Sequence, residues 1–170
     1  SYIESVWWLV KELHKRKLLY KGHKIQWYSP GSGTVLSSHE VSLGYKEIID
    51  PSVYVLIKLL DLDNTYLLIW TTTPWTLPSN VAIAINPKID YALVQDDQKK
   101  IFVAASRANS IFSEPKIIKT LKGSQISNIS YEPLYKIAGE KYSKSCFKTY
   151  TADYVTAEDG SGAVHIAPAF

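Results

Sequence analysis

Apolar residues recur at helical spacing at the start of the chain. The positions that share one predicted helix face are Ile3, Val6, Trp7, Val10 and Leu13. This spacing predicts one amphipathic helix over residues 2–20, with Gly22 placed where a helix C-cap is expected. Trp7 and Trp8 are interpreted as packing residues rather than ligand contacts, because aromatic side chains at helical spacing usually mark a buried face.

Short apolar runs separated by turn residues follow the helix, and each run predicts a strand. The expected strands cover residues 24–28, 52–60, 66–72, 81–86, 91–95, 101–105, 117–121, 147–156 and 163–167. The run over 52–60 is apolar at most positions and predicts a strand buried mostly on both faces. A short helix is expected over 106–112. Many short strands with close turn signals predict a β-rich α+β fold, with a small β-barrel core and peripheral helices.

The chain length of 170 residues fits a single domain with a substantial core. We expect residues 1–45 to form a leading helix and connecting strands, and residues 46–170 to form the barrel core. Methionine is absent, even at position 1, so we expect the chain 1–170 to be one domain excised from a longer protein.

Composition narrows the possible environments and partners. No apolar run approaches the ~20 residues of a membrane span, and the start of the chain carries charges throughout, unlike a signal peptide. The single Cys146 excludes an internal disulfide and fits a reducing compartment, so we expect a cytoplasmic protein without membrane contact or structural metal. The net charge is +3, and lysines recur between residues 11 and 24 and between 136 and 148. These lysines are either solvated faces or phosphate contacts with an RNA 3′ end.

The densest polar feature is the run from Thr71 to Asn80. An apolar strand leads directly into Thr71, Thr72 and Thr73. The two prolines that follow are expected to break regular structure and to free hydroxyls and backbone amides. Such groups can bind an ester carbonyl, a ribose hydroxyl or an attacking water. Threonine also favours strands, so the run could simply end one.

Two further residues of this run have both a structural and a functional interpretation. Trp75 is either a packing residue or a rigid wall that limits the size of a bound side chain. Asn80 either stabilises a turn or contacts a ligand.

A second candidate segment runs from Asp159 to Pro168. Its glycines predict a tight turn that lets the backbone approach a ligand, with Gly162 and Ala163 as the candidate contacts. His165 lies on the following strand and is either structural or binds a ribose, a phosphate or a water. We favour binding and orientation over general-base action, because the sequence identifies no acidic partner for the imidazole.

Together these two segments resemble the signature segments of the editing domains of isoleucyl-tRNA synthetases. The resemblance extends over nearly the whole chain and includes Gly33-Thr34-Val35-Leu36-Ser37, Asp50-Pro51-Ser52-Val53-Tyr54-Val55, Leu121-Lys122-Gly123 and Tyr131-Glu132-Pro133-Leu134. Valyl and leucyl enzymes typically place an arginine and an acidic residue where this chain has Thr73 and Trp75. The run is therefore similar to the isoleucyl pattern.

The resemblance implies the editing-domain fold of the class I (Val/Ile/Leu) synthetases and hydrolysis of valine misattached to the isoleucine tRNA. It implies Thr71, Thr72, Thr73 and His165 as catalytic residues, with Trp75, Asn80, Gly162 and Ala163 as substrate-binding residues. The implied partners are the tRNA(Ile) 3′ end carrying valine and the rest of the parent synthetase. The parent enzyme would join isoleucine to tRNA(Ile) with ATP and magnesium in a separate site, so no cofactor is expected in this domain.

Three points stay open at this level. Free valyl-adenylate is a second conceivable substrate. The family's aspartate that receives the substrate's ammonium group is expected beyond Phe170. The chain could therefore be a binding module for the aminoacylated tRNA end without turnover, or an insertion that only shapes its parent enzyme.

Overall fold

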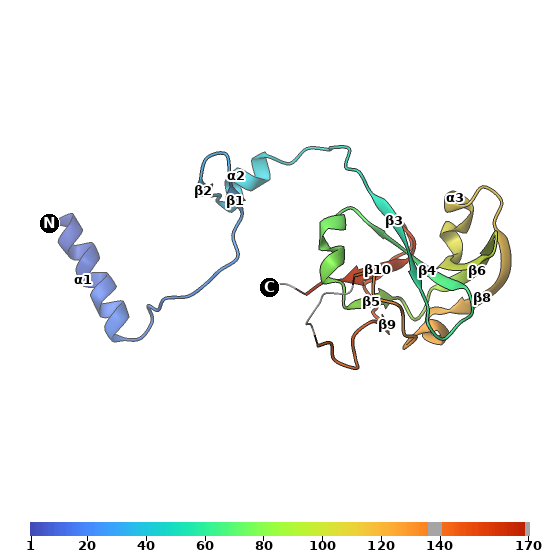
Figure 1. Ribbon diagram of the computed structural model, residues 1–170. Coiled ribbons are helices and arrows are strands. Elements are labelled where there is room, and N and C mark those ends of the chain that lie inside the picture. The colour runs from blue at the N-terminus through green and yellow to red at the C-terminus, as the bar shows by residue number, and fades with distance from the viewer. Residues whose placement is uncertain (136–140, 169–170) are drawn as a thin grey trace. The chain divides into compact units, whose positions relative to one another are not determined.

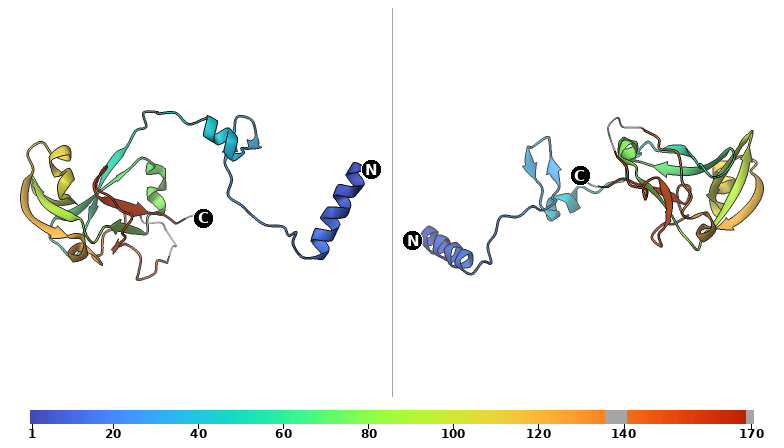
Figure 2. Two further views of the ribbon diagram at one scale, coloured as in Figure 1. Left: turned by 180° about the vertical axis from the view of Figure 1, so that it is seen from behind. Right: turned by 60° about the horizontal axis from the view of Figure 1, so that its bottom comes forward.

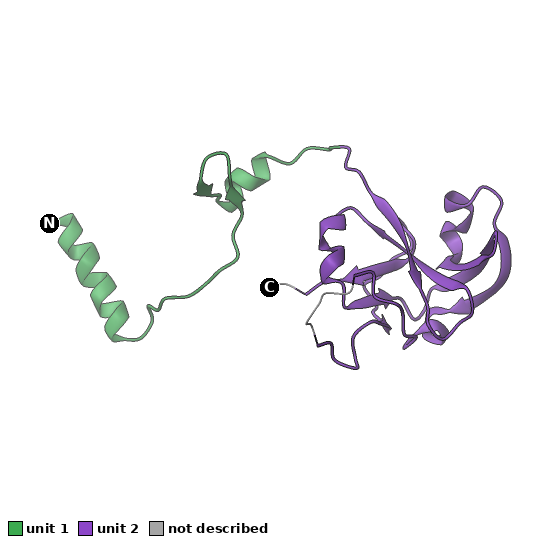
Figure 3. Cartoon of the chain, in the orientation of Figure 1, with its two compact units in different colours: residues 1–48 green, residues 49–170 purple. Residues whose placement is uncertain are grey.

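The computed structural model describes residues 1–135 and 141–168, and the chain divides into two compact units. Unit 1 covers Ser1–Ile48 and unit 2 covers Ile49–Phe170 (Figure 3). The division lies close to the one expected after residue 45. That both units belong to one domain of the parent protein stays a prediction.

Unit 1 begins with helix α1 (Tyr2–Lys15), which is shorter than the predicted helix over 2–20. The predicted cap at Gly22 is wrong, because Lys17 takes the left-handed conformation with φ 58°. The Lys17 amide donates to the His14 carbonyl at 3.0 Å, and the Leu18 amide donates to the Leu13 carbonyl at 3.0 Å. These are the two bonds of a Schellman ending, in which a lysine occupies the position that glycine usually takes.

The rest of unit 1 has little regular structure. Strand β1 (Tyr28–Ser29) pairs with β2 (Thr34–Val35), so most of the strand predicted over 24–28 is wrong. Helix α2 (Ser38–Leu43) was not predicted, although the Ser37 hydroxyl and the Glu40 side chain form a capping box at its start. Trp7 and Trp8 are exposed, so the packing predicted for them does not occur within the described unit 1.

Unit 2 contains a five-stranded mixed sheet with the order β3-β4-β7-β6-β8. Its members are β3 (Val53–Lys58), β4 (Thr65–Thr71), β6 (Asp90–Asp96), β7 (Lys99–Ala104) and β8 (Lys116–Lys122). All neighbours are antiparallel except β4 and β7, which run parallel. The two expected hairpins, β3–β4 and β6–β7, are both present.

A three-stranded sheet has the order β10-β5-β9, with β5 (Ala82–Ile85) at its centre. Strand β10 (Ala163–Ile166) pairs antiparallel with β5, and β9 (Lys148–Thr151) pairs parallel with it. Strand β10 also lies against β4 of the larger sheet, as Figures 1 and 2 show. The short helices of unit 2 are η1 (Pro74–Ser79), η2 (Ala105–Arg107), α3 (Ala108–Ile111) and η3 (Gly123–Ile126).

The expected closed barrel is corrected by this topology. Over residues 1–135 and 141–168 the strands form separate sheets, and β3 and β8 remain edge strands of the larger one. A barrel closes only when its outermost strands pair with each other. The edge position also explains why β3 is not buried on both faces as predicted: Val53 and Tyr54 are exposed. The α+β character that the sequence predicts is present.

Two hydrophobic clusters hold unit 2 together. The larger contains residues from both sheets, among them Ile69, Ile83, Tyr91, Phe102 and Tyr131. The smaller joins the other face of the five-stranded sheet to α3 and includes Leu68, Val94, Val103 and Ala108. Leu68 and Ile69 serve different clusters because successive side chains of a strand point to opposite faces. Within the described part of the chain, no helix is long and apolar enough to cross a membrane.

Candidate functional site

The threonine run lies where β4 ends and η1 begins. Thr71 is buried, and its Oγ1 accepts a hydrogen bond from the Thr73 amide at 3.0 Å. The same Oγ1 lies 3.2 Å from the Thr73 hydroxyl. Thr71 therefore shapes the turn out of the sheet, whereas Thr72 and Thr73 are exposed to solvent. Of the three threonines, Thr72 and Thr73 are thus the ones at the surface, and the Thr73 hydroxyl is paired with Thr71.

The two prolines lie in a 3₁₀-helix rather than breaking regular structure, so that expectation is wrong. Pro74 occupies the first turn of η1, where a backbone amide would have no helical partner in any case. The Thr76 amide donates to the Thr73 carbonyl at 3.1 Å, and the Asn80 amide donates to the Leu77 carbonyl at 3.0 Å. Leu77 is buried and anchors this helix to the core.

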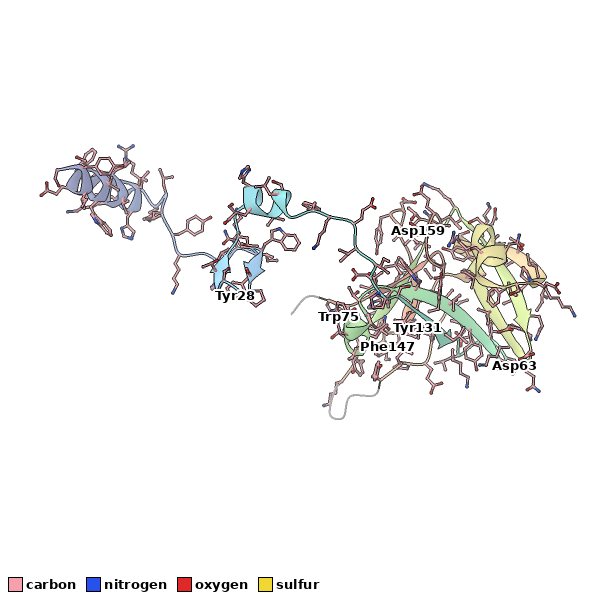
Figure 4. All side chains as sticks on the ribbon, turned by 90° about the horizontal axis from the view of Figure 1, so that it is seen from above. Tyr28, Asp63, Trp75, Tyr131, Phe147 and Asp159 are labelled. Atoms are coloured by element: carbon pink, nitrogen blue, oxygen red, sulfur yellow. The ribbon has the colours of Figure 1, made fainter. Side chains whose placement is uncertain are left out.

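Trp75 lies on the solvent side of η1, with 74% of its surface exposed (Figure 4). This exposure does not match the interpretation as a packing residue, and the interpretation as a pocket wall stays a prediction. A role as a wall requires a ligand that covers the indole.

His165 lies near the end of β10 and is held by the ladder of the smaller sheet. It is paired opposite Ile83 of β5, and Ile83 is paired with Thr149 of β9. Residues paired in this way direct their side chains to the same face, and both Ile83 and Thr149 are buried. The half-buried imidazole reaches η1, where its Nε2 lies 3.0 Å from the hydroxyl of Thr76. The structure thus brings the two candidate segments together through Thr76 and His165.

The hydrogen bonds of Thr76 determine the tautomer of His165. The Thr76 hydroxyl donates its single hydrogen to the Thr73 carbonyl at 2.8 Å. Towards His165 it can then only accept, so Nε2 of the imidazole carries a hydrogen and Nδ1 carries a lone pair. Burial lowers the pKa of His165 from its ordinary value of 6.5, which favours the neutral ring.

The lone pair on Nδ1 is enclosed. Nδ1 is buried and has no hydrogen-bond partner among residues 1–135 and 141–168. An unsatisfied acceptor of this kind costs free energy and can gain a hydrogen bond from a ligand hydroxyl or a water. A group that reaches Nδ1 must first displace the atoms that cover it.

The side chain of Asn80 is directed into the fold. Its Nδ2 donates to the Ala82 carbonyl at 2.9 Å, and its Oδ1 accepts from the Tyr131 hydroxyl at 2.6 Å. Burial raises the pKa of Tyr131 above its ordinary value, so this phenol stays protonated and keeps donating. These contacts are those of the turn interpretation of Asn80.

The glycines of the second segment serve packing. Gly160 and Gly162 have φ values of 67° and 79°, which favour glycine. A Cβ on Gly160 would lie 2.8 Å from Trp70, and one on Gly162 would lie 2.6 Å from the Ala104 Cβ. Gly162 and Ala163 are both buried, so the close backbone approach predicted for this turn is to the protein itself.

The sequence reasoning gave no role to three residues that hold this region. Thr76 lies within the predicted run, and its position one turn after Thr72 and Thr73 was the only available signal. Arg107 and Tyr91 contact the second segment from distant parts of the chain, and nothing in the sequence indicated this. No group of three or more His, Cys, Asp or Glu side chains that could hold a metal occurs within the described ranges.

Comparison with known proteins places the chain among the synthetases. The family described as "tRNA synthetases class I (I, L, M and V)" matches residues 1–159. The isoleucine–tRNA ligase of Picrophilus torridus is 46% identical over 170 residues, and that of Thermus thermophilus is 47% identical over 176 residues. Each alignment covers 100% of this chain but only 16% of the relative, so the chain spans about 16% of the length of these ligases.

Solved structures agree on the fold. GlLeuRS-CP1 superposes with a TM-score of 0.56 at 15% identity, over 68% of this chain and 52% of that one. The editing domain of the P. knowlesi cytosolic leucyl-tRNA synthetase gives a TM-score of 0.51 at 11% identity, over 72% of this chain and 59% of that one. The chain belongs to the class I tRNA synthetase family, is similar to isoleucine–tRNA ligases along its whole length and has the fold of the synthetase editing domains.

Proposed function

We propose that this chain is the editing domain of an isoleucine–tRNA ligase and hydrolyses valine from mischarged tRNA(Ile). One observation carries the proposal. The hydrogen-bonded series from the Thr73 carbonyl through the Thr76 hydroxyl to His165 joins the two candidate segments at one place. Free valyl-adenylate carries the same acyl group and is a second substrate of this site. The parent enzyme joins isoleucine to tRNA(Ile) with ATP elsewhere in its chain, in the cytoplasm.

The roles follow from which polar atoms are free. Thr72 and Thr73 are exposed, and their hydroxyls bind the ester carbonyl, the terminal ribose or the attacking water, although the Thr73 hydroxyl also contacts Thr71 Oγ1. The neutral His165 offers Nδ1 as an acceptor, which orients a ribose hydroxyl or the water. Water adds to the ester carbonyl carbon, the bond to the ribose oxygen breaks, and that oxygen receives a proton. Valine and the tRNA hydroxyl are the products.

A covalent threonine intermediate has no support in this geometry. A hydroxyl nucleophile needs a base that takes its proton. The Thr71 hydroxyl is paired with Thr73, and the imidazole of His165 is paired with Thr76. Trp75, Asn80, Gly162 and Ala163 have weaker support as substrate contacts. Trp75 needs a ligand to cover it, and the other three are buried.

Deacylation by the full-length parent enzyme tests the proposal. The variants Thr72→Val and His165→Gln should each slow the hydrolysis of valyl-tRNA(Ile) at least about tenfold, since positioned hydrogen-bonding groups contribute on the order of 100-fold or more. Thr120→Val is the matched control, because Thr120 is an exposed threonine on β8. Aminoacylation with isoleucine should stay unchanged in all three. Unchanged deacylation in both site variants would contradict the assignment.

The covered Nδ1 favours one alternative, a binding module without turnover. A hydrolysis-resistant valyl-amide analogue of adenosine separates the two functions. If the enzyme binds this analogue through Thr72 and His165 but hydrolyses no ester, the binding module is correct. If both binding and hydrolysis depend on these residues, the editing function stands.

A further inference from the structure

The segment that leads into β10 is attached to β6, β7 and the η2 helix that follows β7. Arg107 donates from Nε to the Gly160 carbonyl at 3.1 Å and from a terminal guanidinium nitrogen to the Glu158 carbonyl at 3.2 Å. The Ala104 amide donates to the Ser161 carbonyl at 2.9 Å. The Tyr91 hydroxyl donates to the Gly162 carbonyl at 2.6 Å. Four hydrogen bonds, to the carbonyls of residues 158, 160, 161 and 162, therefore fix this segment immediately before β10 begins.

Arg107 binds backbone carbonyls of a loop rather than a carboxylate side chain. Its guanidinium is always charged, and its planar fork of donors matches two carbonyl oxygens. The ion pairs found among the described residues join Glu4, Glu12, Asp153 and Asp90 to amino groups, and none of them includes Arg107. Hydrogen bonds from a charged donor are stronger than neutral ones. The bonds to Gly160 and Glu158 are thus the polar contacts that this side chain makes.

Tyr91 connects the two strands at one end of the β5–β10 ladder. Its ring is fully buried, and its hydroxyl accepts from the Asn86 amide at 3.0 Å while donating to Gly162. Asn86 follows the last residue of β5, and Gly162 precedes the first residue of β10. One hydroxyl therefore holds the end of one strand at the start of its neighbour. Burial raises the pKa of Tyr91, so the phenol remains a donor at neutral pH.

Strand register determines what these contacts mean for His165. Ala163 pairs with Ile85 and His165 pairs with Ile83, so the ladder begins where Tyr91 anchors it. A slip of one residue would move every side chain of β10 to the opposite face of the sheet. Val164, the neighbour of His165, lies on the face of β10 opposite to His165 and is exposed to solvent. The anchored turn thus decides that the imidazole, rather than Val164, faces η1.

We infer that Arg107 and Tyr91 are positioning residues for the proposed editing reaction: they hold residues 158–162 so that His165 meets Thr76. This inference rests on the proposed function. Neither residue belongs to the threonine run or to the second segment. Both act through the backbone that leads into β10, and their effect reaches the substrate only through the placement of the imidazole.

The test uses the full-length parent enzyme for kinetics and this chain for spectroscopy. Tyr91→Phe removes one hydroxyl, and Arg107→Gln removes the charge and one arm of the fork. Each variant should lower kcat for valyl-tRNA(Ile) deacylation about tenfold to a hundredfold with KM within about twofold, since misplacing a reacting group by about 1 Å can cost that much. Arg107→Lys keeps the charge without the fork and should restore little. Tyr54→Phe and Lys119→Gln, at exposed positions of β3 and β8, are the matched controls.

The ¹⁵N signals of the His165 imidazole separate positioning from plain stability. In the folded variants, Nε2–H should lose its hydrogen bond to Thr76 and the tautomer preference should weaken. A purely structural role would lower the melting temperature yet leave kcat and these signals unchanged, and that result would overturn the inference. If Tyr91→Phe does not fold, Arg107→Gln alone decides. If His165→Gln itself leaves deacylation unchanged, the proposed function fails, whatever these variants show.

Discussion

The hydroxyl of Thr76 selects the tautomer of His165 through the contact between the two side chains. The Thr76 proton is committed to the Thr73 carbonyl, so the oxygen can only accept from Nε2. Thr76→Val should abolish that acceptor and let both neutral tautomers form, whereas Thr76→Ser should keep the acceptor. The ¹⁵N shifts of the ring report the tautomers, and deacylation should fall about tenfold in the valine variant only. Equal spectra for the two variants would contradict the assigned hydrogen bonding.

The same imidazole makes stability depend on pH. Burial lowers the pKa of His165 in the folded state below its unfolded value of 6.5. Between these two values the unfolded chain binds more protons, so stability rises with pH there. The contribution of His165 is therefore complete above about pH 6.5 and decreases as the pH falls towards the folded pKa.

Chemical unfolding from pH 5 to pH 8 checks this dependence. The free energy of unfolding of the wild-type chain should fall more steeply below pH 6.5 than that of His165→Gln, which cannot titrate. The difference between the two curves isolates this residue from the other titrating groups. Parallel curves would mean that the imidazole is not desolvated.

At the level of helices and strands, local sequence patterns predicted the features that depend on neighbouring residues alone. The hairpins β3–β4 and β6–β7 follow from apolar runs flanking Asp61–Asn64 and Asp96-Asp97, since turn residues and alternation act within a few positions. The ends of α1 and η1 were not predictable in the same way. Lys17 adopts the left-handed conformation that glycine usually takes at a helix end. Pro74 and Pro78 lie in a 3₁₀-helix, whereas the prediction considered only that proline interrupts a strand.

The junction between β8 and η3 gives a sharp test of packing between elements. A Cβ on Gly123 would lie 1.9 Å from the Asn86 carbonyl oxygen, which is backbone and cannot rotate away. Gly123→Ala should therefore lower the free energy of unfolding of unit 2 by about 1–3 kcal/mol, the typical cost of overpacking. Ser124→Ala, one residue later and exposed, should change the stability little. Denaturant unfolding of both variants measures the difference, and equal midpoints would contradict the close approach.

For the molecule as a whole, every buried hydrophobic residue of the described chain lies between Ile57 and Ala163. Unit 1 contributes none, and residues 18–27 and 45–52 contain no helix or strand. Limited trypsin digestion should therefore cut first after Lys17, Lys21, Lys24 and Lys46 and leave a resistant fragment that starts near Glu47. Mass spectrometry identifies the fragments. Early cleavage at Lys119, within β8, would show that unit 2 opens as readily as unit 1.

Arrangement over the whole molecule is also where sequence reasoning failed most clearly. The strands of the smaller sheet were predicted, but the separate sheets were not, because closure depends on which edges meet and not on any run of residues. The candidate site shows the same division. Thr72, Thr73 and His165 could be selected from their own segments. The contacts of Arg107 and Tyr91 depend on strand order, which no local pattern encodes.

The order of strands in the smaller sheet has a consequence for biosynthesis. Strand β5 is complete at Ile85, yet its partners are β9, which ends at Thr151, and β10, which ends at Ile166. During translation the Ala-Ile-Ala-Ile segment must wait for partners that leave the ribosome roughly 3–16 s later, at usual rates of synthesis. Chaperones that recognise short apolar segments have that interval in which to bind it. The candidate editing site would therefore be among the last parts of this chain to form on the ribosome, even though its threonines are made before the midpoint.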